Sequence, residues 1–300
     1  ATHGLVGLNL FFPQFGTVGQ MLSLSPTAVR VPNSLVERDG GLDPQTFLAA
    51  PAIAEQFKQA GVVTYAYKPY EIIDSVLSKM HGRGVEKNIG VVSLADMLQQ
   101  IKHQLEQPTS ERLFISAYWP VIDTLSHVYG PHSPNVTAEL NAITHQLQTL
   151  LLDALSPAAW QDTAICLVAD HGQINMPHRL FADDYPDLQQ LLLIENSGEP
   201  RTPYLYARQG QQTALRDYLR QNFSEAMVPL TAVELIEHGL LGPHTPSPVI
   251  AQRLGDVIPL MRDGWGFVPT MGRKKIKRFL GMHGGLTPDE MRVPWLVWRK

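Results

Sequence analysis

Short apolar segments alternate along this chain with segments of helical periodicity. Helical patterns occur at residues 44–59, 93–106, 136–155, 211–221 and 231–237. The segments that we expect to form strands are residues 61–67, 113–118, 164–169, 203–207, 257–261 and 293–298. Strands that alternate with helices predict parallel βαβ units, with helices on both faces of a mostly parallel central sheet. The sequence therefore predicts an α/β fold.

Two of the predicted strands are almost continuously apolar. These are residues 113–118 and 164–169, and such runs are typical of strands buried on both faces. The direction of the last predicted strand does not follow from the sequence.

For two of these helices, the sequence also indicates the residue at which the helix begins. The helix at 136–155 follows Asn135, a residue type that often caps helices. The helix at 44–59 follows Asp43 and has Pro44 at its first position, where proline is favoured.

Length and composition agree with an ordinary globular protein. The chain has 300 residues, of which 44 % are hydrophobic and 17 % charged. Because an α/β sheet protein of this length is often one domain, we expect residues 1–300 to form a single domain. The net charge of −4 argues against binding to nucleic-acid polymers or to a membrane surface. Apolar runs also stay well short of the roughly 20 residues that span a bilayer.

Cysteine usage limits the chemistry further. Cys166 is the only cysteine, so an intrachain disulfide and a cysteine-based zinc site are both excluded. A reducing, cytoplasmic compartment is favoured, with the periplasm as the alternative. The oligomeric state does not follow from the sequence.

Residues with metal-ligand side chains gather where predicted strands end or glycine-rich turns begin. Asp170 and His171 directly follow one predicted strand, and Asp123 and His127 lie shortly after another. His283 lies in a glycine-rich segment before the last predicted strand. Ligands of parallel α/β sheets bind beyond the carboxyl ends of the strands. Two carboxylates and three imidazoles could hold two divalent cations, a common device for cleaving phosphate esters. Five protein ligands are, however, too few to close two sites.

Each of these segments also has a plainer interpretation. Asp123 and His127 could share one ion if they lie on a helical turn, but alone this pair favours a solvated turn. Asp170 and His171 could form a turn with an Asp cap, although a buried carboxylate is costly without a partner. His283 alone fits a surface loop, whose glycines would let the backbone approach a ligand closely.

Four segments carry motifs whose order and separations match those of one protein family. They are HGLVGLN (residues 3–9), YWPVIDTLSHVYGP (118–131), VADHG (168–172) and MHGGLTP (282–288). They resemble the His-Gly…Asn, Tyr…Asp-x-x-x-His-x-x-Gly-Pro, Asp-His-Gly and terminal His-Gly segments of the type I phosphodiesterase/nucleotide pyrophosphatase family, in the alkaline phosphatase superfamily. The resemblance covers nearly the whole chain. One departure is Ile122, where the family usually has proline before the aspartate.

The resemblance implies an alkaline phosphatase-like fold with a site for two divalent metal ions, zinc or alternatively manganese. Asp123, His127 and His283 would hold one ion. Asp170 and His171 would hold the second, together with an Asp and a Thr or Ser nucleophile that the family carries further upstream.

The resemblance also implies that the chain lacks its N-terminal strand and the helix with the nucleophile. The first acidic residue is Glu37, and Thr2 lies beside His3, too close to be the nucleophile. Asn9 lies where the family would place an amide that donates to a phosphoryl oxygen. Its spacing from His3 is one residue longer than the commonest pattern, so a turn residue is the alternative.

The function that the resemblance implies is metal-dependent hydrolysis of phosphoric ester or pyrophosphate bonds in small phosphate esters or nucleotides. The alternatives are a phosphomonoesterase, a sulfatase or a phosphomutase, since fold and metal ligands do not separate these activities. Two non-enzymatic alternatives are a catalytically silent metal-binding fragment and a metal-free α/β binding module.

Overall fold

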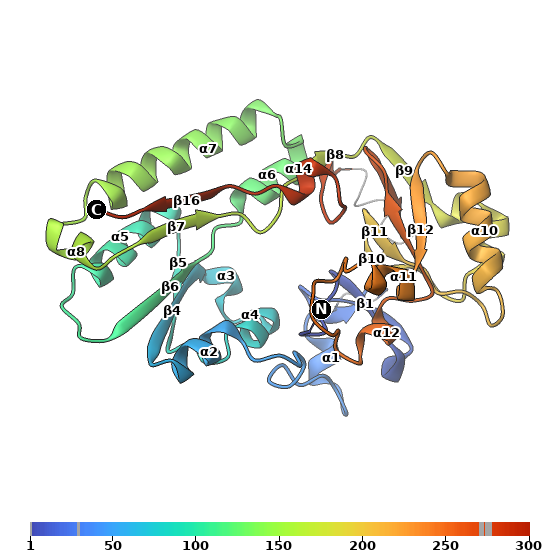
Figure 1. The fold of residues 1–300 in the computed structure, drawn as a ribbon, viewed down its shortest axis with the longest axis horizontal. Coiled ribbons are helices and arrows are strands. Elements are labelled where there is room, and N and C mark those ends of the chain that lie inside the picture. Colours follow the sequence, from blue (N-terminus) through green and yellow to red (C-terminus); the bar gives the residue numbers. More distant parts are fainter. Residues whose placement is uncertain (1, 29–30, 270–272, 274–277) are drawn as a thin grey trace. The chain divides into compact units, whose positions relative to one another are not determined.

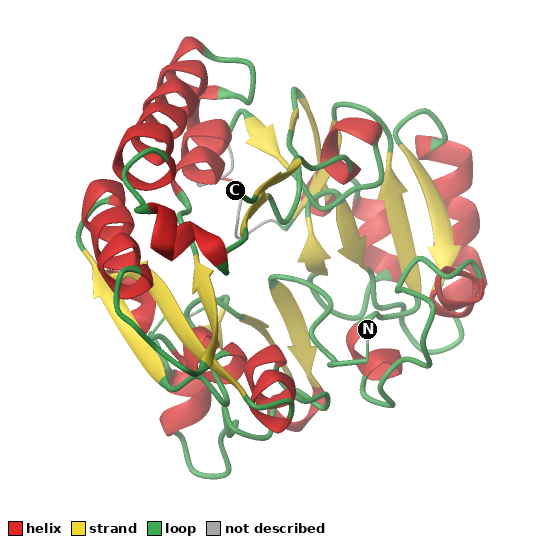
Figure 2. Cartoon of the chain, turned by 60° about the vertical axis from the view of Figure 1, so that its left-hand side comes forward, coloured by secondary structure: helices red, strands yellow, loops and turns green. Residues whose placement is uncertain are grey.

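The chain folds into two compact units in the computed structural model, which describes residues 2–28, 31–269, 273 and 278–300 (Figures 1 and 2). Unit 1 comprises residues 1–50 and 171–292, and unit 2 comprises residues 51–170 and 293–300. The chain therefore passes from one unit to the other three times, once between Asp170 and His171. That residues 1–300 form a single domain stays a prediction.

A parallel three-stranded sheet lies at the centre of unit 2, in the order β5–β4–β6 (Figure 1). Its strands are β4 (Val62–Pro69), β5 (Lys87–Val91) and β6 (Arg112–Ala117). Both β5 and β6 run parallel to β4. Helix α5 (Leu94–Leu105) connects β5 to β6, which confirms the predicted βαβ unit.

Strand β7 (Ile165–Val168) pairs with β16 (Trp295–Trp298), and the two run antiparallel. Ile165 and Trp298 pack against the apolar cluster beneath the helices of unit 2. On the alternate positions, Val168 and Val297 are each 53 % exposed. The prediction that β7 is buried on both faces is thus wrong, because the apolar cluster covers only one of its faces. On β6, Leu113 and Ile115 pack against that cluster and Phe114 packs against Phe57 of α2, but the last two residues of the strand are exposed.

The helices of unit 2 supply most of its apolar core. They are α2 (Ile53–Gln59), α3 (Tyr70–Ile73), α4 (Val76–His81), α5, α6 (Val121–Tyr129), α7 (Pro134–Leu147), the π-helical η2 (Gln148–Leu152) and α8 (Pro157–Gln161). Leu98, Leu151 and Trp160 pack with Tyr65 and Tyr67 of β4. One face of the parallel sheet is therefore covered by α5, η2 and α8.

Two predicted helix starts are wrong. Helix α7 begins after Ser133, whose hydroxyl accepts a hydrogen bond from the Val136 N–H at 3.4 Å, and not after Asn135. Only Ile53–Gln59 of the predicted helix at 44–59 is helical. Pro51 disfavours helical geometry in the residue before it, and residues 44–50 form turns and bends instead.

An antiparallel five-stranded sheet forms part of unit 1, in the order β11–β10–β1–β2–β3. Its strands are β1 (Asn9–Phe12), β2 (Thr17–Gln20), β3 (Ser25–Pro26), β10 (Ser197–Glu199) and β11 (Thr202–Tyr204). The β10–β11 hairpin pairs with β1 through Asn9 and Gly198. The parallel arrangement predicted for the central sheet thus holds for the β5–β4–β6 sheet of unit 2, whereas the β7–β16 pair and this sheet of unit 1 are antiparallel.

Three further strand pairs complete the described sheets of unit 1: β8 (Ile174–Asn175) with β15 (Gly281–Met282), β9 (His178–Phe181) with β14 (Trp265–Val268), and β12 (Met227–Thr231) with β13 (Val257–Met261). Its short helices are η1 (Pro13–Phe15), α1 (Ser34–Glu37), η3 (Ala182–Asp184), α9 (Pro186–Leu191), α11 (Ala232–Glu237), α12 (Ile250–Arg253) and α14 (Pro288–Met291).

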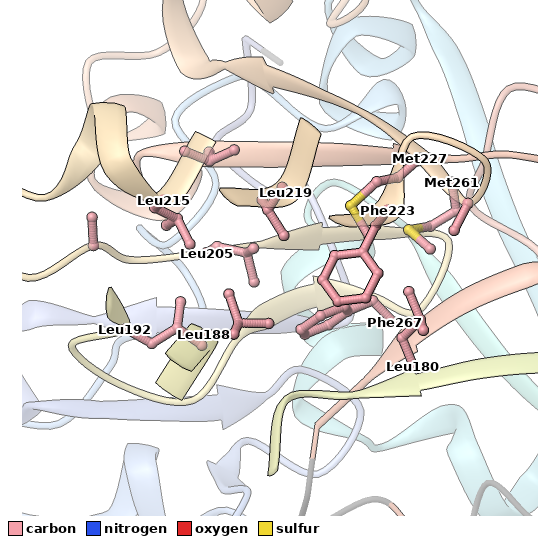
Figure 3. Packing of buried hydrophobic residues seen from close by; sticks show 13 residues of the cluster. Leu180, Leu188, Leu192, Leu205, Leu215, Leu219, Phe223, Met227, Met261 and Phe267 are labelled. Carbon is pink, nitrogen blue, oxygen red and sulfur yellow. The ribbon is translucent and has the colours of Figure 1, made fainter. Parts of the chain in front are cut away.

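The longest helix of unit 1, α10 (Gln212–Phe223), packs on the unit's main apolar core (Figure 3). Leu215, Leu219 and Phe223 recur at every fourth position, so they share one helical face and are buried. They contact a cluster that includes Leu205 and Phe267. Among the helices of the described residues, none is both long and apolar enough to cross a lipid bilayer.

Candidate functional site

Asp123 and His127 lie together on helix α6 of unit 2. The helix begins shortly after β6 ends, and it contains the predicted helical turn. The Oδ1 atom of Asp123 is 3.4 Å from the Nε2 atom of His127, and both side chains are half-buried. Because residues four apart share a helical face, the pair presents an oxygen and a nitrogen donor in one direction.

Asp170 lies two residues beyond β7 and is also close to the α6 region of unit 2. Partial burial raises the pKa of the Tyr118 hydroxyl, and the negative charges of Asp170 and Asp123 raise it further. Tyr118 therefore lies within electrostatic range of both carboxylates. Tyr118 belongs to the 118–131 motif, but the sequence alone did not single it out as a site residue.

His171 and His283 stack on each other in unit 1. Their ring centroids are 3.6 Å apart and the rings are inclined by only 14°. His171 Nδ1 is 3.0 Å from the Gly172 carbonyl oxygen. If Nδ1 donates there, Nε2 is the nitrogen that carries the lone pair.

The pairing of β8 with β15 explains how these two histidines meet. Met282 is opposite Ile174 in this antiparallel pair. His283 directly follows Met282, and His171 lies three residues before Ile174. The strand pair thus places two segments that are far apart in the sequence side by side.

Hydrogen bonds on both sides hold the turn after His283. Gly284 has a φ of +99°, a conformation that favours glycine, and its carbonyl accepts a hydrogen bond from the Thr202 hydroxyl. The Gly285 N–H donates to Glu290 Oε1 at 2.9 Å. The position of His283 therefore depends on neighbours from β11 and α14.

A buried ion pair behind this turn escaped the sequence analysis. Arg201 Nε donates to Glu290 Oε1 at 2.8 Å, and Arg201 Nη2 donates to Oε2 at 2.9 Å. Burial alone would raise the pKa of Glu290, but the hydrogen bonds and charge of Arg201 outweigh it, so the pKa is lowered. Thr287 and Glu290 form a capping box, a spacing that is recognisable in sequence. Arg201 carries no such signal.

Asn9 lies on β1, in unit 1, where its Nδ2 donates to the Gly198 carbonyl at 3.2 Å. Next to it, the Leu8 N–H donates to Glu199 Oε1 at 2.6 Å, and burial raises the pKa of Glu199 to about 7. One amide hydrogen of Asn9 is thus used within the sheet. Its contact with a phosphoryl oxygen stays a prediction.

The six predicted site residues divide between the units. Unit 2 contains Asp123, His127 and Asp170, whereas unit 1 contains Asn9, His171 and His283. The structure brings together Asp123 with His127 and His171 with His283. The combination of these pairs into two metal sites stays a prediction.

Aspartate and histidine side chains beyond the ends of the strands of an α/β chain are a donor set that could bind a metal ion, and comparison with known proteins identifies the family. The family model for type I phosphodiesterase/nucleotide pyrophosphatase matches residues 2–286. The chain therefore belongs to this family and is a hydrolase, which confirms the resemblance. Among curated proteins, none matches the chain by sequence.

Solved structures agree on the alkaline phosphatase-like α/β fold. Murine ectonucleotide pyrophosphatase/phosphodiesterase 5 has a TM-score of 0.70 and 17 % identity, over 99 % of this chain and 72 % of that one. The human protein of the same name gives the same values. Phosphonoacetate hydrolase from Sinorhizobium meliloti 1021 has a TM-score of 0.60 and 18 % identity, over 99 % of this chain and 74 % of that one. At these identities the likeness shows the fold alone.

Proposed function

We propose that this chain forms the metal-binding part of a phosphodiesterase or nucleotide pyrophosphatase that acts on small nucleotide-like substrates. The observation that carries the proposal is the pairing of donor side chains, Asp123 with His127 and His171 with His283, in a member of this family. An inactive variant of the murine structural relative has been solved in complex with AMP, which supports a nucleotide-like substrate.

The proposed site holds two divalent cations, the second of them with additional ligands from the family's upstream motif. Under this proposal, Asp123, His127 and His283 hold one ion, and Asp170 and His171 contribute to the other. Carboxylate oxygen and imidazole nitrogen are ligands of zinc, and both are also compatible with manganese. When bound, such ions polarise phosphoryl oxygens and lower the pKa of a hydroxyl or a water molecule.

The side chains of the chain itself would orient the substrate. Asn9 would use its second amide hydrogen to bind a phosphoryl oxygen. Tyr118, whose pKa is raised, would stay protonated near neutral pH and could donate a hydrogen bond close to Asp123 and Asp170. Both groups are neutral hydrogen-bond donors, so they would bind a phosphate without the repulsion that a negatively charged side chain causes.

The nucleophile in this proposal is the Thr or Ser of the family's upstream motif. Its oxygen would form a bond to phosphorus while the bond to the leaving oxygen breaks, giving a covalent phosphoryl enzyme. Water would then cleave that bond and release the phosphate product. The full-length gene product is therefore the form of the protein to assay.

The test compares bis-p-nitrophenyl phosphate with p-nitrophenyl phosphate, using the full-length gene product and added zinc or manganese. We expect faster turnover of the diester, and loss of turnover when the upstream Thr or Ser is replaced by Ala. A strong preference for the monoester would instead support a phosphomonoesterase.

Metal analysis of residues 1–300 tests the alternative of a silent fragment. A silent fragment would hold about one zinc ion per chain, whereas two tightly held ions with turnover would refute that alternative. No metal binding would favour the metal-free binding module.

A further inference from the structure

We propose that Arg201 and Glu290 are positioning residues, which hold the His171 and His283 turns in the arrangement needed for metal binding. The inference rests on the proposed metal-dependent function, and it assigns a role to two residues outside the predicted ligand set. Every contact that carries it lies within unit 1.

Glu290 contacts the residues next to both histidines. Its carboxylate accepts a hydrogen bond from the N–H of Gly285, two residues after His283. Its main-chain carbonyl accepts a hydrogen bond from the N–H of Gly172, directly after His171, at 2.8 Å. A Cβ atom at Gly172 would collide with the Asp289 carbonyl oxygen, so this close approach requires glycine. One residue therefore fixes the turns on which both stacked rings lie.

Arg201 anchors Glu290 to the rest of unit 1. Arg201 is 0 % exposed and Glu290 2 % exposed. The guanidinium also donates, through Nη1, to the carbonyl oxygens of Arg262 and Trp265. Thr202, the next residue, binds the Gly284 carbonyl. The His283 turn is thus tied to β11 through two neighbouring side chains.

A buried ion pair such as Arg201–Glu290 contributes little to the stability of the fold by itself. Removing two charges from water costs free energy that their attraction offsets only with good geometry and full hydrogen bonding. Here Oε1 accepts from Arg201 and Gly285, and Oε2 accepts from Arg201 and Thr287. The contacts that satisfy the carboxylate are those that hold the turn after His283, so the pair specifies a local geometry.

The chain contains a similar pair on α11, whose hydrogen bonds run to Thr231, Arg216 and the His238 N–H and not to the residues beside His171 and His283. Glu234 closes a capping box with Thr231 and binds Arg216, as Glu290 does with Thr287 and Arg201. The Glu234 side chain is 33 % exposed and the Arg216 side chain 21 % exposed. Glu234→Gln therefore removes the same kind of interaction away from His171 and His283, and it serves as the control.

The experiment uses two variants of different kinds. Glu290→Gln neutralises the carboxylate, whereas Gly285→Ala keeps both charges but places a Cβ atom 2.7 Å from Glu290 Oε2 and 2.9 Å from Oε1. Circular dichroism confirms folding of each variant. Titration calorimetry with zinc gives the dissociation constant, and NMR of the histidine ring nitrogens in the metal-free protein reports the His171–His283 stack.

We expect both variants to weaken zinc binding about 10- to 100-fold, as loss of groups that orient metal ligands does elsewhere. Both should shift the ring resonances of His171 and His283, and Glu234→Gln should change neither readout. Wild-type zinc affinity and ring resonances in folded Glu290→Gln and Gly285→Ala would overturn the inference. So would equal changes in Glu234→Gln.

If wild-type protein binds neither zinc nor manganese, the proposed function fails. In that case, the His171 and His283 ring resonances of the metal-free variants still show whether Arg201 and Glu290 hold the two rings in place. The two failures are therefore distinguishable.

Discussion

The Asp123 carboxylate and the His127 imidazole are the donors whose proximity was most directly predicted from the sequence. Asp123→Asn and His127→Ala should each weaken zinc binding by more than about 100-fold, because loss of a ligand exceeds the usual effect of an outer-shell partner. Titration calorimetry of the folded variants measures this.

His145→Ala is the control for these two variants. His145 is exposed on α7, so its loss should leave zinc affinity unchanged. Wild-type affinity in Asp123→Asn would show that this carboxylate does not bind the ion.

Glu199 should make the stability of the protein depend on pH. Its pKa is about 7 in the folded protein, against the ordinary value of 4.5 that we take for the unfolded chain. Between these values the folded state holds a proton that the unfolded state has lost, so stability falls as the pH rises from about 4.5 through 7. The upper limit is about 3 kcal/mol.

Glu199→Gln tests this, because glutamine keeps an oxygen that can accept from Leu8 N–H but does not titrate. The difference between the Tm values at pH 5 and pH 8 should be smaller than in the wild type. An unchanged difference would assign the pH dependence to other groups.

At the residue scale, the sequence predicts partners that lie close together along the chain. The spacing of Asp123 and His127 predicts that they share a helical face, and they do. The stack of His171 and His283 depends on pairing between distant segments, which no local pattern encodes. Arg201 was missed for the same reason, since its partner Glu290 lies 89 residues away in the sequence.

Among the helices, α7 offers a test of which residue acts as its cap. Ser133→Ala should lower the free energy of unfolding by about 1 kcal/mol, because the Val136 N–H loses its acceptor. Asn135→Ala, at the position that the sequence suggested, should have a much smaller effect. Urea denaturation of both variants measures the difference, and a larger loss in Asn135→Ala would contradict the assignment.

Strands and helices with strong local patterns were predicted well. The predicted strand at 61–67 corresponds to β4, and the helix at 93–106 corresponds to α5. The helix at 44–59 was wrong in its first part, where residues 44–50 form turns and bends before Pro51. Burial of β7 on both faces was also wrong, since what covers a strand is decided by tertiary contacts.

For the whole molecule, the α/β class followed from alternation of strands and helices, but the antiparallel sheet of unit 1 did not. In that sheet β1 pairs with β10, and Asn9 is opposite Gly198, almost 190 residues later in the sequence. The family motifs nevertheless identified the fold, because they depend on the order of site residues and not on strand direction.

Metal binding should stabilise the folded protein as a whole. With free zinc at 100 times its dissociation constant, the expected gain is about 2.7 kcal/mol, because the ion binds the folded state preferentially. Adding EDTA should therefore lower the Tm of zinc-loaded protein, as measured by differential scanning calorimetry. Asp123→Asn should respond less to both additions, and an EDTA-insensitive Tm in the wild type would argue against tight binding.

The exposure of Cys166 makes distance measurements straightforward. It is the only thiol of the chain, it lies on the surface of β7, and Asp170 follows four residues later. A maleimide fluorophore would therefore attach at a single known place without mutagenesis. Coloured ions such as Co²⁺ or Cu²⁺ quench a nearby dye by energy transfer, so titrating the labelled protein would locate the bound ion by spectroscopy.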